Sequence, residues 1–357
     1  MKILQVITSM RIGGAEKLVA EMAPRMQNAG HQVDVLLFDG TSTPLKEQLE
    51  KEGINVYHLA IGKSVYHPLF IFQLIAYLKK YDIIHTHNTA CQLFVAIASL
   101  FITKGEKPRL ITTEHSTTNR RRKWAFYKYI DRWMYQRYHQ VVAISEIAKD
   151  KLHTYLKQSS NQIHVIPNGI NLQAFQQDYS LSFKQHPDDV ILTMVAGFRK
   201  GKDQMTLIKA MKELPNHFHL YLVGDGILKN DHEQFVNSLS LQDRVHFLGI
   251  RNDIPAILKA SDIVLMSSEY EGLSLSNIEG MASGKPFLAS DVDGLREITK
   301  DAGILFPLGN TNILIKEIML LMNNNKHYME VCKRCLQKAS LYNINNTITN
   351  YLKIYNP

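Results

Sequence analysis

The chain has 357 residues, 45% of them hydrophobic, and at this length two domains are the default expectation. Its longest apolar stretches, such as residues 93–102, are far shorter than the roughly 20 residues that a membrane-spanning helix needs, which excludes an integral membrane protein. The cysteines Cys91, Cys332 and Cys335 are too few for a disulfide framework, so we expect reduced thiols. A strand pattern begins directly at Met1, with no apolar signal region, and this predicts a cytoplasmic protein.

The formal net charge of +8 favours an anionic partner, such as a nucleotide diphosphate, nucleic acid or an acidic membrane face. The densest positive cluster is Arg120-Arg121-Arg122-Lys123, and residues 124–138 after it are rich in aromatic side chains. This segment has two interpretations. It fits an anionic membrane surface, and it also fits a solvated helix start followed by an aromatic stripe that faces the core.

Short apolar runs alternate with helical patterns along the chain. In the first half, this pattern predicts a helix at about 15–29 and strands at 3–8, 32–38, 55–59, 83–85, 110–113, 140–143 and 164–166. The second half predicts strands at 190–196, 218–223, 245–248, 263–266 and 286–289. This β-α-β rhythm is typical of an α/β fold whose parallel sheets carry helices on both faces.

A turn signal, P-N-G at 167–169, separates the two similar halves and marks a hinge. We therefore predict an N-terminal Rossmann-like domain at 1–168 and a C-terminal one at 169–341. A helix-like segment at about 342–357 follows the second domain.

Ligands of open α/β sheets bind at the carboxyl ends of the strands, so the loops there are the candidate sites. Gly13 and Gly14 follow the first strand and open a helix, where the backbone can approach a phosphate. The spacing is not G-x-G-x-x-G, which weakens a dinucleotide interpretation. A plain turn remains the alternative for this glycine pair.

The most informative segment is 267–286, which follows a buried strand. It bends at Gly272, begins a helix with serines suited to capping, and ends the helix near Gly284. Glu271 is expected on the strand-to-helix turn and Glu279 inside the helix. A carboxylate can accept two hydrogen bonds from a vicinal diol, so two carboxylates can bind two sugars.

The run E-G-L-S…E-G-M-A-S-G-K-P at 271–286 resembles the E-x7-E element of glycosyltransferase family 4, whose members are retaining enzymes of the GT-B fold. The resemblance implies two Rossmann-like domains that face each other across a deep interdomain cleft. It places Glu271 beside the transferred sugar and Glu279 on the ribose of the donor nucleotide. Backbone N–H groups of Gly272, Leu273 and Ser274 would meet the sugar and diphosphate.

Other segments resemble the same family in the expected order. Gly13-Gly14 is similar to the family's donor-phosphate loop, and the stretch with Gly249, Ile250 and Arg251 is similar to the one whose backbone meets the nucleobase. The segment 345–355 resembles the terminal helix that returns to the first domain.

One position departs from the family pattern. The family usually has an arginine and a lysine that bind the donor diphosphate after the first strand of the second domain. Here Lys202 aligns with the lysine, and Gly197 stands where the arginine is expected. Arg199 replaces that arginine from a nearby position, or the contact is missing.

His115 follows a strand and resembles the family's active-site histidine near the transferred sugar. The pair His85 and His87 shows no third ligand, so no metal is expected there. Asp291 and Asp293 are similar to a D-x-D metal motif of another glycosyltransferase fold, but a structural role is expected, because the resembled family has no metal at this loop.

The resemblance predicts a metal-independent glycosyltransferase that keeps the anomeric configuration, with no cofactor. The expected partners are a UDP-sugar and a glycan or lipid-linked acceptor of bacterial surface polysaccharide synthesis, rather than nucleic acid. A peripheral position at the inner face of the plasma membrane, through the Arg120–Lys123 cluster, goes with a lipid-linked acceptor.

Three alternatives stay open. A GT-B sugar-nucleotide epimerase would isomerise the free nucleotide-sugar without an acceptor. A nicotinamide-dependent oxidoreductase would need the glycine fingerprint that the chain lacks. A nonenzymatic nucleotide-sugar-binding protein is motivated only by Gly197.

Overall fold

The protein was analysed as a computed structural model that describes residues 1–11, 13–103, 105, 107–115, 124–156 and 163–356. It contains two compact units. Unit 1 comprises Met1–Gly169 and Ile344–Pro357, and unit 2 comprises Ile170–Asn343. These divisions lie one and two residues beyond the boundaries expected from the sequence, because helix α14 of unit 1 begins at Ile344.

The division at the end of unit 1 has a steric cause. A Cβ atom on Gly169 would lie 2.6 Å from the Cα atom of Ile344, so only glycine lets the first residue of α14 approach this segment so closely. Next to it, Ile170 bridges to Asn343 and donates its N–H to the carbonyl of Tyr342 at 2.9 Å. The chain therefore leaves unit 1 after Gly169 and returns to it at Ile344 through two segments that lie side by side.

Unit 1 contains a parallel sheet with the strand order β3-β2-β1-β4-β5-β6-β7. Its strands are β1 (Lys2–Ile7), β2 (Gln32–Asp39), β3 (Asn55–Ala60), β4 (Ile83–Thr86), β5 (Arg109–Glu114), β6 (Gln140–Ala143) and β7 (Ile163–Val165). Since all pairs are parallel, the carboxyl ends of these strands share one edge of the sheet.

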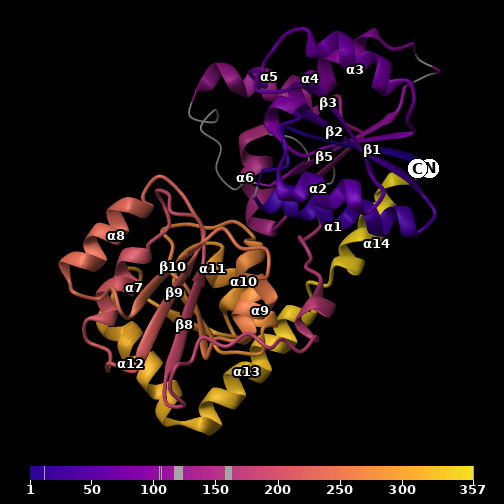
Figure 1. The fold of residues 1–357 in the computed structure, drawn as a ribbon. Coiled ribbons are helices and arrows are strands. Elements are labelled where there is room, and N and C mark those ends of the chain that lie inside the picture. The colour runs from indigo at the N-terminus through magenta and orange to yellow at the C-terminus, as the bar shows by residue number, and fades with distance from the viewer. Residues whose placement is uncertain (12, 104, 106, 116–123, 157–162, 357) are drawn as a thin grey trace. The chain divides into compact units, whose positions relative to one another are not determined.

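Helices cover both faces of this sheet, with α1, α2 and α14 on one face and α3, α4 and α5 on the other (Figure 1). In chain order these elements are α1 (Gly14–Asn28), α2 (Pro44–Lys51), α3 (Phe70–Leu78), α4 (Thr89–Ala98), the short 3-10 turn η1 (Ser99–Phe101), α5 (Ala125–Tyr135), α6 (Glu146–Leu156) and α14 (Ile344–Tyr355). None of the helices that the structure describes is long and apolar enough to cross a membrane.

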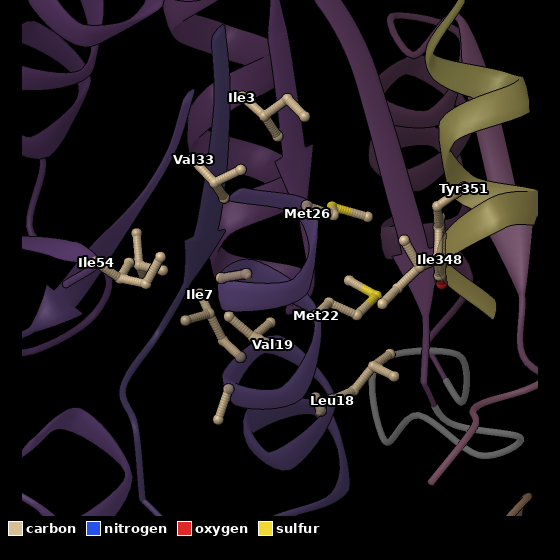
Figure 2. Packing of buried hydrophobic residues seen from close by; sticks show 14 of the residues in the cluster. Ile3, Ile7, Leu18, Val19, Met22, Met26, Val33, Ile54, Ile348 and Tyr351 are labelled. Carbon is tan, nitrogen blue, oxygen red and sulfur yellow. The ribbon is translucent and has the colours of Figure 1, made fainter. Parts of the chain in front are cut away.

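The core of unit 1 joins the chain's two ends. In Figure 2, the side of α1 with Met22 and Met26 faces the side of α14 with Ile348 and Tyr351. All four side chains are buried in one cluster with Ile3. Each fully buried side chain of this size contributes about 1.5–3 kcal/mol. Helix α14 is therefore an integral layer of unit 1, although 174 residues of unit 2 separate it from Gly169 along the chain.

Unit 2 contains a second sheet with the strand order β10-β9-β8-β11-β12-β13, and all its pairs are parallel. Its strands are β8 (Val190–Val195), β9 (Phe218–Val223), β10 (Val245–Gly249), β11 (Ile263–Met266), β12 (Phe287–Ser290) and β13 (Ile304–Phe306). The sequence analysis did not predict β13, although it predicted β7, which is equally short.

The helices of unit 2 connect these strands, and the last two of them lead along the chain to α14. They are η4 (Leu172–Phe175), α7 (Gln204–Met211), α8 (Lys229–Ser238), α9 (Ile254–Lys259), α10 (Leu275–Ala282), α11 (Leu295–Thr299), α12 (Thr311–Asn323) and α13 (Asn325–Ser340). Helices α7 and α12 pack together, as do α10 and α13. The loops after β8 to β12 are left at the carboxyl edge of the sheet.

Candidate active site

In unit 2, the loops after β8 and β9 pack backbone to backbone. Gly224 and Gly226 have φ angles of +138° and +157°. A Cβ on Gly224 would lie 2.3 Å from the carbonyl oxygen of Ala196, and one on Gly226 would lie 2.2 Å from that of Phe198. The two glycines thus allow these strand ends to approach each other closely.

The loop after β8 also joins the loop after β11. Lys202 forms an antiparallel bridge with Ser268, and the Ser268 hydroxyl donates to the carbonyl of Gly201 at 2.7 Å. The Tyr270 ring lies over Gly201, where a Cβ would come within 2.8 Å of the ring. Gly201 also has a φ of +93°, so a side chain there would clash and strain the backbone.

This pairing of loops brings together Lys202 and Glu271, which form a salt bridge. Both side chains are only 10% exposed. The Ser268 hydroxyl also lies 3.0 Å from Glu271 Oε1, so its single proton is shared between this carboxylate and the carbonyl of Gly201.

Burial lowers the pKa of the Lys202 ammonium to about 7, and the positive charge of Arg199 acts in the same direction. The Glu271 carboxylate acts in the opposite direction, because an anion in contact favours the charged form of lysine. The buried ammonium therefore depends on an anionic neighbour, and Glu271 is that neighbour in this structure.

A third loop, after β12, packs against the backbone of Glu271. Gly294 has a φ of +83°, and a Cβ on it would lie 2.1 Å from the carbonyl oxygen of Glu271. Asp291 and Asp293 in this loop are both paired with Arg296, at 2.5 Å and 3.6 Å. The D-x-D sequence thus takes part in a local ion-pair cluster beside the Glu271 turn.

Helix α10 begins directly after this turn, with Ser274 at its N-cap position. The Ser274 side chain makes no capping hydrogen bond, so the expectation of a serine cap was wrong. The first N–H groups of a helix have no acceptor within it and carry a positive partial charge. Gly272, Leu273 and Ser274 lie at this end, and Glu279 lies within the helix.

The remaining residues expected to bind the donor lie on neighbouring loops of unit 2. Arg199 is exposed and close enough to Lys202 for its charge to lower that pKa. Gly249 has a φ of +65°, Ile250 is 57% exposed, and Arg251 donates two hydrogen bonds to Asp253 at 2.8 and 2.6 Å. Next to Gly197 there is room for a Cβ, whose nearest neighbour would lie at 3.4 Å, so no backbone clash explains the missing arginine.

In unit 1, the glycine pair lies at the start of α1. Gly13 is the N-cap residue with an extended backbone, and Gly14 is the first residue of the helix. A Cβ on Gly14 would meet no atom within 4 Å. A Cβ on Gly13, by contrast, would lie 2.3 Å from a carboxylate oxygen of Glu16, so a phosphate at the N-terminus of this 15-residue helix would have to displace that side chain.

His115, at the end of β5, lies in a cluster of three histidines. His87 Nδ1 is 3.0 Å from His115 Nε2, and the rings of His85 and His87 are 4.1 Å apart. Burial lowers the pKa of His85 and His87 well below 6.5 and lowers that of His115 to about 4. All three imidazoles are therefore neutral at pH 7.

The aromatic segment after the basic cluster divides into two parts. Trp124, Phe126 and Tyr129 are 69%, 71% and 70% exposed, whereas Tyr135 and Tyr138 are buried. The core-facing interpretation is thus wrong for the first turns of α5 and right for its end. Residues Arg120, Arg121, Arg122 and Lys123 lie outside the described part of the chain.

Sequence reasoning missed several residues that shape these sites. Gly294 and Ser268 support Glu271, and Gln5 and Tyr355 belong to the surroundings of the histidines. Gln5 gave a signal, since it interrupts the apolar strand β1 and is fully buried. The three cysteines are buried and free, as expected.

Comparison with known proteins assigns both units. Residues 12–174 match the family model described as Glycosyltransferase Family 4, and residues 177–340 match that described as Glycosyl transferases group 1. The chain is 24% identical to UDP-Gal:alpha-D-GlcNAc-diphosphoundecaprenol alpha-1,3-galactosyltransferase of Escherichia coli, over 95% of this chain and 92% of that protein. It is also 24% identical to N-acetyl-alpha-D-glucosaminyl L-malate synthase of Bacillus anthracis, over 96% and 94% of the two chains.

Among solved structures, Anabaena HepE in complex with UDP-glucose superposes with a TM-score of 0.82 at 21% identity, and the match covers 99% of this chain and 100% of that one. The fold of two Rossmann-like units is therefore that of the GT-B proteins. Since the two family models together account for nearly the whole sequence, the chain is a glycosyltransferase of the GT-B fold, with a family 4 domain followed by a glycosyl transferases group 1 domain.

Proposed function

We propose that this glycosyltransferase moves a sugar from a UDP-sugar to an acceptor hydroxyl, without a metal ion and with retention of the anomeric configuration. The observation that carries this proposal is the buried Lys202–Glu271 pair at the end of β8 and β11. A buried ammonium that needs an anionic neighbour is suited to a diphosphate. A carboxylate beside it is suited to the hydroxyls of the attached sugar.

In the proposed reaction, the bond between the anomeric carbon and the oxygen of the β-phosphate breaks, and a bond from the acceptor oxygen to that carbon forms. Both events take place on the same face of the sugar. The acceptor's proton passes to an oxygen of the departing diphosphate. The main catalytic task is to stabilise the negative charge that develops on this leaving group.

The chain's own groups can perform that task. Lys202 and Arg199 supply positive charge, and the α10 N-terminus supplies N–H donors from Gly272, Leu273 and Ser274. When the diphosphate takes over Lys202, Glu271 is released from its salt bridge and can bind the transferred sugar. In unit 1, we assign Gly13 and Gly14 to the diphosphate and His115 to the sugar by their likeness to the family.

We assign the nucleoside to two further elements of unit 2. Glu279 accepts hydrogen bonds from the ribose hydroxyls, and the exposed turn of Gly249, Ile250 and Arg251 meets the base with its backbone. The preference for uridine rests on the likeness to Anabaena HepE, solved with UDP-glucose, and to the Escherichia coli enzyme that is named for UDP-Gal.

For the acceptor we propose a lipid-linked glycan at the inner face of the plasma membrane. The Escherichia coli relative is named for a diphosphoundecaprenol acceptor. In unit 1, Trp124, Phe126 and Tyr129 of the α5 segment expose their rings, as a surface that meets lipid headgroups does. Replacing Trp124 and Phe126 by serine should reduce sedimentation with anionic vesicles, whereas Ile227→Ser, 88% exposed in unit 2, should leave it unchanged.

The test of the reaction compares Glu271→Gln with Glu269→Gln. Glu269 is exposed two residues away, so it is a matched control on the same loop. We expect Glu271→Gln to lower UDP release by about a hundredfold or more and Glu269→Gln to retain activity. Activity should survive a chelator, and NMR of the product should show an α-linkage from an α-linked donor. Equal activity of the two variants, or isomerisation of the UDP-sugar without acceptor, would overturn the proposal.

A further inference from the structure

A continuous chain of buried polar side chains connects the C-terminal helix α14 with His115, and the proposed reaction leaves it unexplained. Tyr355 of α14 bonds to His85 Nδ1 at 2.7 Å and receives a hydrogen bond from Gln5 Nε2 at 3.3 Å. Gln5 Oε1 is 2.7 Å from His87 Nε2, and His87 Nδ1 is 3.0 Å from His115 Nε2. All these groups belong to unit 1.

A second branch anchors His85. Its Nε2 is 2.7 Å from the hydroxyl of Thr113, which is 3.0 Å from the hydroxyl of Tyr351, one turn before Tyr355 on α14. Every residue of this network except His115, which is partly exposed, is at least nine-tenths buried. Because a buried polar group is costly without a partner, the donors and acceptors must alternate consistently along the network.

Gln5 sets the direction of the alternation. Its Nε2 lies within 4.0 Å of the Met26 sulfur, a weak acceptor, and its Oε1 faces His87 at a distance typical of an N–H···O bond. An amide oxygen only accepts, so His87 carries its proton on Nε2. The neutral ring of His87 then presents the lone pair of Nδ1 to His115.

The last step fixes the state of His115. Since His87 Nδ1 accepts, His115 Nε2 must donate, and the neutral His115 ring keeps a lone pair on Nδ1. That Nδ1 is buried, and no donor from the described part of the chain reaches it. The network thus ends in one unpaired acceptor, on the residue that the proposed function assigns to the sugar.

We propose that Gln5 and His87 are positioning residues that hold His115 with its proton on Nε2, so that Nδ1 accepts a hydrogen bond from a hydroxyl or amide N–H of the transferred sugar. The inference rests on the proposed function for the identity of the ligand only. It assigns the substrate class further, because the donor sugar must offer a hydrogen-bond donor to this nitrogen. It also gives α14 a role in the site, through the partner that Tyr355 provides for Gln5.

The first experiment reads the proton positions directly in the full chain labelled with ¹⁵N-histidine. Long-range ¹H–¹⁵N correlations at pH 7 should show His87 and His115 both protonated on Nε2, with signals assigned from single His→Asn variants. Adding a UDP-sugar should shift the His115 Nδ1 signal, while UDP alone should not. An Nδ1–H form of His87 or His115 would overturn the inference, and so would an Nδ1 signal that ignores the sugar.

The second experiment separates positioning from general packing. Gln5→Met keeps the side chain's length but removes the acceptor for His87, and we expect kcat/KM for the donor to fall about three- to tenfold. In a His115→Ala background the same change should have almost no effect, because the two residues act through one another. An equal loss in both backgrounds would show a merely structural role.

These readouts distinguish a failure of the proton-position inference from a failure of the proposed function. The proton positions in the free protein do not depend on catalysis, so a chain that turns over UDP-sugar with His115 in the Nδ1–H form contradicts the inference alone. A protein with the expected proton positions that neither binds nor turns over any nucleotide-sugar contradicts the proposed function, and with it the sugar contact at Nδ1.

Discussion

Acidification should destabilise unit 1 through its buried histidines. His85 and His87 are 0% and 2% exposed, and burial holds their pKa values well below 6.5 in the folded protein. In the unfolded chain they titrate near 6.5. The unfolded state therefore binds more protons as the pH falls through 6.5, so the stability present above this pH is lost below it.

The magnitude follows from the same linkage. When the pH falls from about 7.5 to about 5.5, each histidine that stays neutral in the folded protein lowers the free energy of unfolding by about 1.4 kcal/mol. The pair together lowers it by about 3 kcal/mol. This is a large fraction of the roughly 5–15 kcal/mol that stabilises a typical domain. His115, with a pKa lowered to about 4, acts in the same direction.

The assay is urea unfolding followed by tryptophan fluorescence. The protein has two tryptophans, Trp124 and Trp133, and both belong to unit 1, so the signal reports that unit alone. The relevant quantity is the change in the free energy of unfolding between the two pH values. It should shrink by about 1.4 kcal/mol in His85→Gln and remain unchanged in His217→Gln, which replaces an exposed histidine of unit 2. If acidification lowered the free energy of unfolding of His85→Gln and of the wild type by the same amount, the reasoning would be refuted.

The remaining predictions concern three other positions. Gly294→Ala should lower turnover at least tenfold with little effect on UDP affinity, because its Cβ would displace the carbonyl of Glu271; steady-state kinetics and calorimetry separate the two. Burial lowers the pKa of Lys202 and the Glu271 carboxylate opposes this, so donor affinity should fall as the pH rises through the range in which the ammonium loses its proton; Lys202→Arg should remove this trend in titration calorimetry. Tyr355→Phe should lower the stability of unit 1 by about 1–3 kcal/mol in the fluorescence assay, because the amide of Gln5 and the ring of His85 lose a partner.

The strand and helix pattern of this chain was readable because it is periodic over long segments. Strand β1, with its apolar run after Lys2, and helix α1 opening at Gly14 agree closely with the sequence prediction. Strand β13 (Ile304–Phe306) was not predicted, although the equally short β7 (Ile163–Val165) was. Local periodicity therefore predicts the architecture, and it is an uneven guide for elements of three residues.

The sequence named the candidate residues of the site but could not show their connections. The sequence proposes Glu271 and Lys202 as donor-binding residues, yet nothing in it showed that the two form a buried pair. The hydrogen bond between Gln5 and Tyr355 spans 350 residues, so no local pattern can show it. Contacts made by tertiary folding, between strand ends and a helix from the far end of the chain, determine which side chains meet.

The central claim is that this chain transfers sugar from a nucleotide-sugar, and the most direct test is a panel of UDP-, GDP- and ADP-sugars scored for nucleotide release by the full-length protein. The account predicts turnover of a UDP-sugar, slow with water and faster with a lipid-linked glycan acceptor, and its loss in Glu271→Gln. Absence of turnover and binding for every donor in the panel would contradict it.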